Sequence, residues 1–191
     1  MLQKKVFLWQ NWNEGVIIWK ITGKKVENMS LEIERKFLVN EKWEPQGRTI
    51  HVKQGYLPGT GPMLVRVRQE DSRAFLTLKG RTEGITRSEY EYEIPMEDAG
   101  ELLERCERPI IEKTRYLIPA GPHTWEVDVF FGANEGLIVA EIELSDENES
   151  FEKPAWLGVE VSGDVRYYNS NLASFPYSEW KNDAPAPRGG Q

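Results

Sequence analysis

The sequence predicts a mainly β protein, all-β or α+β, whose strands form an antiparallel sheet or barrel. Three observations support this fold class. About eight short segments alternate between polar and apolar residues, the period expected of a strand with one buried face. Turn signals rich in Gly, Pro, Asn, Asp and Ser separate them, as in antiparallel sheets. Only one or two segments show a helical pattern, so helices are the minor component.

The first predicted strand, Glu32–Val39, shows the pattern most clearly. Glu32, Glu34 and Lys36 fall on one face of such a strand, and the odd positions are apolar except for Arg35. The other predicted strands follow at short intervals. They are residues 48–56, 64–68, 74–79, 86–94, 111–117, 125–130 and 137–144.

Two segments between and after these strands have helical features. Residues 97–106 follow Pro95 and begin with two acids, which the positive end of a helix dipole favours. Residues 164–173 are expected to open a short final helix. Residues 156–158 are predicted to be a loop.

The composition narrows the class of protein. The chain has 191 residues, which fits one domain with tails, and a formal net charge of −7. That charge argues against a nucleic-acid binder that works by bulk positive charge, although a local basic cavity remains compatible with it. Cys106 is the single cysteine, which excludes an intrachain disulfide and fits a reducing compartment. His51 and His123 form no zinc-ligand spacing.

The two ends differ from the middle of the chain. Apolar stretches in residues 1–28 are too short and too interrupted for a signal peptide or a membrane span. We expect residues 1–28 to be an N-terminal extension preceding a true start at Met29, with a genuine extra hairpin or tail as the alternative. Residues 182–191 are rich in Pro and Gly and are predicted to be a disordered tail. The domain is therefore expected at residues 29–181.

Charges of one sign occur in pairs along single strands. An isolated pair is most often the solvated face of a sheet. Here basic and acidic pairs alternate between strands, and like charges two residues apart repel unless an opposite charge lies near them. A barrel with these faces inside would require water, metal and an anion to offset the cost of desolvation. A polyanion with a divalent metal satisfies both signs. The pairs are Arg66/Arg68, Lys113/Arg115, Glu89/Glu91 and Glu141/Glu143.

An ordered set of motifs resembles the CYTH domain, also called the triphosphate tunnel metalloenzyme family, in its short single-domain bacterial form. The resemblance covers residues 31–175. Its motifs are Glu32-x-Glu34-x-Lys36, Gln54-Gly55-Tyr56, Arg66-x-Arg68, Thr77-Leu78-Lys79, Arg87-x-Glu89-Tyr90-Glu91, Glu112 to Tyr116, Glu126-x-Asp128-x-Phe130, Glu141-x-Glu143 and Asp164-x-Arg166-Tyr167-x-Asn169.

The resemblance implies a closed eight-stranded antiparallel β-barrel with helices packed outside, a triphosphate substrate and a divalent metal, Mg²⁺ or Mn²⁺. It also implies roles for individual residues. The phosphate-binding residues would be Lys36, Arg66, Arg68, Lys79, Lys113, Arg115 and Arg166. The metal-binding group would be Glu32, Glu34, Glu141, Glu143 and Asp128, the last as a partner of the ligands or a further acid. The catalytic residues would be Lys36, Glu89, Glu91 and Lys113, with Glu89 and Glu91 supporting a second metal or orienting the attacking water.

The function implied is metal-dependent hydrolysis of a triphosphate, with inorganic triphosphate favoured because no base-recognition loop is evident. A class IV adenylyl cyclase or a thiamine triphosphatase on the same fold is the alternative. A non-catalytic polyphosphate- or nucleotide-binding module is an alternative of another class. We expect a cytoplasmic protein without nucleic-acid or membrane partners, and a homodimer is compatible with the outer face. Glu93 and Glu126 are expected to be structural or solvent-facing, and Tyr56 to be either packed or part of the tunnel.

Overall fold

The computed structural model describes residues 30–59, 61, 63–80 and 86–184. The predicted extension at 1–28 lies outside the described residues, as does most of the predicted C-terminal tail. The strands are β1 (Ser30–Val39), β2 (Arg48–Tyr56), β3 (Leu64–Glu70), β4 (Arg73–Lys79), β5 (Thr86–Ile94), β6 (Ile111–Ala120), β7 (His123–Phe130), β8 (Ile138–Leu144) and β9 (Leu157–Glu160). The helices are α1 (Met96–Glu104) and α2 (Asn169–Ser174), with four 3₁₀ turns, η1 (Gly132–Asn134), η2 (Val165–Tyr167), η3 (Tyr177–Glu179) and η4 (Lys181–Asp183).

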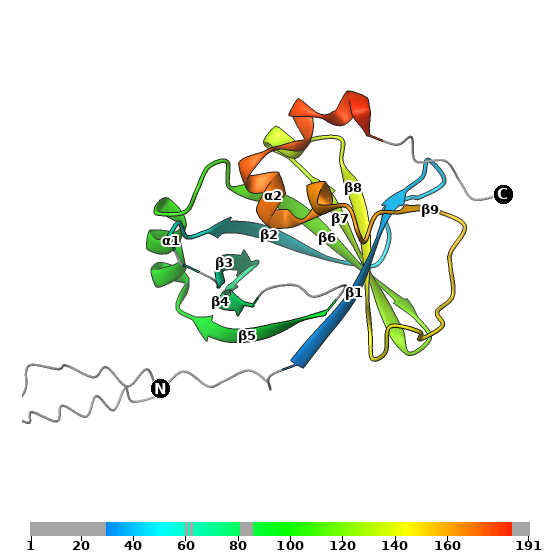
Figure 1. Cartoon of the computed structure of the whole chain (residues 1–191), viewed down its shortest axis with the longest axis horizontal. Coiled ribbons are helices and arrows are strands. Elements are labelled where there is room, and N and C mark those ends of the chain that lie inside the picture. Colours follow the sequence, from blue (N-terminus) through cyan, green and yellow to red (C-terminus); the bar gives the residue numbers. More distant parts are fainter. Residues whose placement is uncertain (1–29, 60, 62, 81–85, 185–191) are drawn as a thin grey trace, which may run out of the picture.

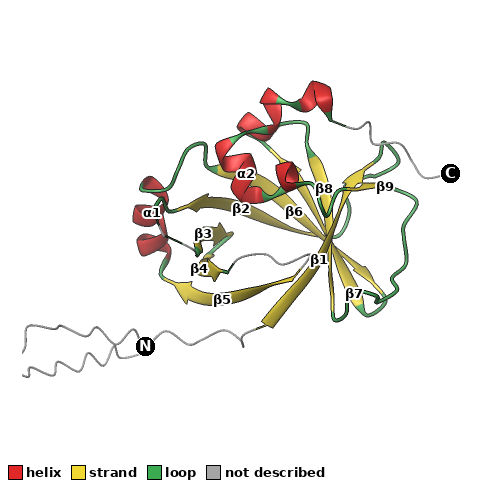
Figure 2. Cartoon of the chain, viewed as in Figure 1, coloured by secondary structure: helices red, strands yellow, loops and turns green. Residues whose placement is uncertain are grey.

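The strands form one antiparallel sheet that returns to its starting strand (Figures 1 and 2). Its order is β5-β4-β3-β2-β6-β7-β8-β1-β9, and β1 also pairs with β5. One edge of β1 pairs with β8 from Ile33 to Leu38. The other edge pairs first with β5, at residues 30–33, and later with β9. The β1–β5 pairing joins the two ends of an eight-strand set, so the predicted closed barrel is confirmed.

The register determines which residues face the inside. Residues directly opposite each other on neighbouring strands point to the same face of a sheet. Lys36 lies opposite Glu141, and Arg115 lies opposite Asp128. On the other side of the barrel, Arg66 lies opposite Thr77. The inward face therefore carries most of the alternating charges that the sequence contains.

Two apolar layers cover the outside of the barrel. Helix α1 packs its buried Ala99 and Leu103 against Val67 and Ala74 of β3 and β4. The second layer centres on Trp125, whose ring makes edge-to-face contacts with neighbouring aromatic rings. The residues of this layer are Ile33, Phe37, Val39, Trp125, Val127, Ala140, Ile142, Leu144, Trp156 and Leu157.

Helix α1 lies on the outside of the barrel, whereas helix α2 covers one end of it. Leu172 of α2 and Tyr167 of η2 pack with Phe130, which shares the inward face with Lys113. Trp180 completes this cluster and contacts the Tyr167 ring edge to face. Helix α2 packs against β2 and β6, and Figure 1 shows it (orange) above β2. Apolar side chains therefore fill this end of the barrel.

The structure corrects one local prediction. Residues 156–158 were predicted to be a loop, but Leu157 begins β9 and pairs with Val39 of β1. The reason is that β5 leaves the last residues of β1 unpaired on one edge, and β9 takes up those backbone groups. Residues 182 and 183, the first of the predicted tail, belong to η4, and the tail and domain bounds stay predictions. No helix among the described residues is long and apolar enough to cross a membrane.

Candidate active site

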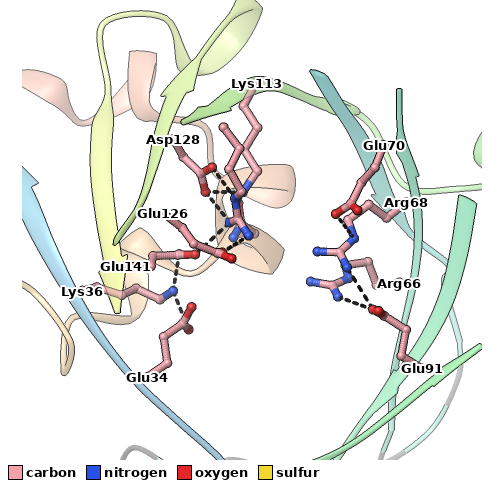
Figure 3. A network of polar contacts seen from close by, with 12 residues as sticks. Glu34, Lys36, Arg66, Arg68, Glu70, Glu91, Lys113, Glu126, Asp128 and Glu141 are labelled. Atoms are coloured by element: carbon pink, nitrogen blue, oxygen red, sulfur yellow. Dashed lines mark hydrogen bonds and ion pairs between the residues drawn. The ribbon is translucent and has the colours of Figure 1, made fainter. Parts of the chain in front are cut away.

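Charged side chains line the inside of the barrel in two groups that face each other (Figure 3). Every cation in these groups is ion-paired with at least one carboxylate. The first group, on β1, β6, β7 and β8, consists of Glu34, Lys36, Lys113, Arg115, Glu126, Asp128 and Glu141. The second, on β3, β4 and β5, consists of Arg66, Arg68, Glu70, Lys79, Glu89 and Glu91.

Lys36 connects β1 to β8 within the first group. Its Nζ donates to Glu34 Oε2 at 2.7 Å and to Glu141 Oε1. The amine is buried, which alone would lower its pKa, but Glu141 and Glu34 outweigh burial and the pKa of Lys36 is raised. Lys36 therefore stays charged at every physiological pH.

Arg115 is the centre of the first group. Its Nε and one terminal nitrogen donate to the two oxygens of Asp128, both at 2.7 Å, in a forked geometry. The same terminal nitrogen donates to Glu141 Oε2 at 2.9 Å, and the other terminal nitrogen donates to Glu126. Burial raises the pKa of Glu141, but Lys36 and Arg115 reverse the effect and hold it well below its ordinary value. Glu141 is thus an ionised bridge between the two cations.

Lys113 lies closest to the apolar end of the barrel. Its Nζ donates to Asp128, lies 3.5 Å from Asn169 Oδ1 of α2, and is 5.3 Å from the centre of the Phe130 ring. Burial and the neighbouring Arg115 lower the pKa of Lys113, although Asp128 opposes them. A further negative group beside Lys113 would therefore favour its charged form.

The second group is built around Glu91. Its Oε2 accepts from one terminal nitrogen of Arg66 at 3.2 Å, from Arg68 at 3.0 Å and from the Thr77 hydroxyl at 2.9 Å. Burial raises the pKa of Glu91, but Arg68 and Arg66 outweigh burial and the pKa is lowered. Glu89 pairs with Lys79, the remaining cation of this group, at 2.5 Å, and also lies 3.3 Å from Arg66.

Arg166 lies apart from both groups in its described contacts. Its guanidinium donates to Asp164 and lies over the Trp180 ring, 5.0 Å from the ring centre. The predicted phosphate-binding role of Arg166 stays a prediction. Asp128 is fully buried and accepts from Lys113 and Arg115, which favours the partner role over direct metal binding.

The comparisons with known proteins agree with this geometry. The CYTH domain profile matches residues 30–170, about three quarters of the chain. The chain belongs to the CYTH domain family. An inorganic triphosphatase from Acetivibrio thermocellus is 50% identical over 155 residues, which are 80% of this chain and 99% of the relative. An inorganic triphosphatase from Nitrosomonas europaea is 38% identical over 147 residues, 74% of this chain and 96% of the relative.

A solved structure supports the same assignment. The crystal structure of the inorganic triphosphatase NE1496 has a TM-score of 0.57 to this chain at 36% identity, covering 74% of this chain and 97% of that one. As a member of the CYTH family, the triphosphate tunnel metalloenzymes, the protein is implied to use a divalent metal.

Three of the carboxylates predicted to hold metal lie on the paired strands β1 and β8. Glu34 lies directly opposite Glu143, and Glu141 is the next inward residue of β8. Two like charges directly opposite each other are unfavourable unless a cation lies between or beside them. Glu32 belongs to the same face of β1, but its side chain lies outside the described residues. Carboxylate oxygens are the donors that a hard divalent metal prefers, but no three potential ligand side chains among the described residues are grouped closely enough to form a metal site. The assignment of individual ligands stays a prediction.

Sequence reasoning missed three inward residues of this CYTH site. Glu126, expected to be structural or solvent-facing, pairs with Arg115, and Glu70 pairs with Arg68 at 3.0 Å. Thr77 joins Arg66 to Glu91. The sequence could have indicated each of them, because each lies two residues from a predicted site residue on the same strand and so points to the same face. Arg35, the outlier of β1, points outward and donates to both oxygens of Glu160.

Stability should depend on pH through Glu91. Its folded pKa lies below its ordinary value, so its ionisation stabilises the fold fully above about pH 4.3, the pKa of an unfolded Glu. That stabilisation is lost as the pH falls through the folded pKa. We expect the free energy of unfolding to drop between pH 5 and pH 3 in metal-free buffer, measured by urea titration at each pH.

Two variants give the matched comparison for this pH dependence. Glu91→Gln should show a shallower drop, because the group that titrates is gone. Glu101→Gln, on the exposed side of α1, should keep the wild-type slope. Equal slopes for wild type and Glu91→Gln would show that Glu91 contributes nothing to the acid response.

Proposed function

We propose that this CYTH protein hydrolyses a triphosphate to diphosphate and phosphate in a reaction that depends on Mg²⁺ or Mn²⁺, with inorganic triphosphate as the favoured substrate. One observation carries the proposal most directly. Six cations of two facing groups line one barrel interior, together with carboxylates suited to a metal. The named triphosphatases at 50% and 38% identity support the reaction type.

The charges suit a substrate that carries several negative charges at once. Each of these cations is paired with a protein carboxylate, so the interior is a network of both charges rather than a bare positive pocket. A triphosphate would compete with these carboxylates for Arg66 and Arg68 on one wall, and for Lys36, Lys113 and Arg115 on the other. Guanidinium groups bind phosphate oxygens through paired N–H donors, and lysines act as point charges.

A divalent metal would be held by Glu34, Glu143 and Glu32, with Glu141 beside them. When bound, such an ion supplies positive charge on the phosphate oxygens and lowers the pKa of a coordinated water. Lys36, whose amine is held by Glu34 and Glu141, would offer its charge to a phosphoryl oxygen beside these carboxylates.

The protein's own residues supply positioning and charge stabilisation. The transferred phosphoryl group gains little covalent help from a protein, and its negative charge must be matched by fixed cations. Lys36 and the arginines would match that charge. Lys113, beside Asp128, would stabilise the leaving diphosphate. Glu91 accepts from several donors and has a lowered pKa, so it orients groups rather than removing a proton.

The test is phosphate release from inorganic triphosphate by the wild-type protein with Mg²⁺, with Mn²⁺ and with EDTA. We expect release with metal and none with EDTA. Glu34→Ala should lose at least about 100-fold in rate and weaken Mn²⁺ binding, since a hard oxygen ligand is removed. Glu112→Ala, on the exposed outer face of β6, is the matched control and should behave as wild type.

Three other outcomes would redirect the proposal. Cyclic AMP and diphosphate from ATP would indicate an adenylyl cyclase. Faster turnover of thiamine triphosphate than of inorganic triphosphate would change the substrate. Binding of triphosphate without turnover in either metal would remove hydrolysis and favour a non-catalytic binding module.

A further inference from the structure

Thr77 occupies the middle of a row that crosses three strands. It lies directly opposite Arg66 of β3 on one side and Glu91 of β5 on the other. Its side chain is fully buried on the inward face. The hydroxyl accepts from a terminal nitrogen of Arg66 at 3.2 Å and donates to Glu91 Oε2 at 2.9 Å. One hydroxyl therefore uses both its donor and its acceptor capacity within the charged site.

The size of Thr77 matters as much as its hydroxyl. The Arg66 nitrogen also reaches Glu91 itself, at 3.2 Å, across the position of Thr77. Arg66 and Glu91 lie on strands that flank β4, so their backbones are about two strand spacings, roughly 9–10 Å, apart. A long side chain at position 77 would block the contact between their side chains. The contacts among these three residues thus hold the Arg66 and Glu91 side chains together on the β3–β5 side of the barrel.

The guanidinium of Arg66 is left with unused donor capacity. One terminal nitrogen serves three acceptors, Thr77, Glu89 and Glu91. The buried Nε has no hydrogen-bond acceptor among the residues that the structure describes. A buried N–H without an acceptor is costly, and such groups are often completed by a ligand. In Figure 3 the guanidinium groups of Arg66 and Arg68 project toward the opposite wall.

We propose that Thr77 is a positioning residue of the phosphate site, which ties one edge of the Arg66 guanidinium to Glu91 so that its remaining N–H groups can take a phosphate oxygen. This inference rests on the proposed function for the identity of the anion. Thr77 itself touches no phosphate in this arrangement. Its contribution is the fixed orientation of Arg66, which lowers the entropy lost when the anion binds.

The experiment measures binding of inorganic triphosphate by calorimetry in EDTA, where no hydrolysis occurs. Thr77→Val keeps the shape and removes the hydroxyl, and we expect its affinity to fall about 5- to 10-fold, the effect of one lost hydrogen bond of ordinary strength. Thr77→Ser keeps the hydroxyl and should bind within about twofold of wild type. With metal, kcat/KM for triphosphate should follow the same order.

Thr114→Val is the matched control. Thr114 is also a buried threonine in a central strand, but its hydroxyl lies 3.3 Å from His51 Nδ1, on the outer face. It should keep wild-type affinity while showing a comparable change in thermal stability. This control separates a loss of fold stability from a loss of orientation at Arg66.

Distinct results would overturn the inference. Wild-type affinity in Thr77→Val, or an equal loss in Thr77→Ser, would show that the hydroxyl does not position Arg66. If Thr77→Val does not fold, Thr77→Ala replaces it, and Ala binding as well as Ser would also contradict the proposal. Failure of wild-type hydrolysis with bound triphosphate would remove the proposed function, while the metal-free comparison would still decide the role of Thr77.

Discussion

Replacing Lys36 by alanine is expected to lower phosphate release from inorganic triphosphate by at least about 100-fold, with the fold intact. The expected size follows from preorganised charge stabilisation, where loss of one donor to a developing oxyanion costs roughly 10²–10³ in kcat. Lys36 meets the conditions for that effect because it is buried, its pKa is raised, and Glu34 and Glu141 fix its amine. The effect should appear mainly in kcat, because the charge develops in the transition state.

Lys53→Ala is the matched control for Lys36→Ala. Lys53 lies on the outer face of β2 and pairs at 3.2 Å with Glu112, both about half exposed. Its loss should leave kcat and KM unchanged, since it faces away from the barrel interior. Phosphate release by Lys36→Ala within about tenfold of wild type would contradict the assigned role of this amine. Circular dichroism and a thermal melt of each variant would show that the fold is retained.

Strand parity explains how much the sequence could predict. Within each strand, the side-chain period of two placed Lys36, Arg66 and Glu141 on the charged face of their own strand without any structural information. Every strand predicted by alternation is present, and α1 lies within two residues of its predicted bounds at Met96–Glu104. Closure of the sheet was implied only by the family resemblance, because alternation is the same in an open sheet.

Contacts between strands were beyond the reach of the sequence. Parity places Glu126 inside the barrel, but only the structure shows that it pairs with Arg115 and lies directly opposite Glu141 of β8. The same holds for Asp128, whose two oxygens are used by cations on β6. The position of α2 could not be predicted either, because its apolar residues fit the end of the barrel as well as its outside.

Asp128→Asn is expected to be the most destabilising single change in the site, by roughly 3–5 kcal/mol. The substitution keeps the side-chain volume but removes the negative charge between Lys113 and Arg115. All three side chains are buried, and breaking a buried ion pair leaves an uncompensated charge that costs about this amount. The free energy of unfolding would be measured by urea titration of metal-free protein at pH 7. A loss below about 1 kcal/mol would contradict this account, since that is the range of an exposed pair.

A second variant decides whether the cost comes from the unpaired charge itself. Asp128→Asn combined with Lys113→Met removes both partners, and the replacement of a buried pair by neutral groups is often close to neutral. We therefore expect the double variant to recover at least about 1–2 kcal/mol of the loss, with Arg115 still paired to Glu126 and Glu141. Glu160→Ala breaks the partly exposed pair with Arg35 on the outer face and should cost no more than about 1 kcal/mol. No recovery in the double variant would mean that Asp128 stabilises the barrel through hydrogen bonding to Arg115 alone.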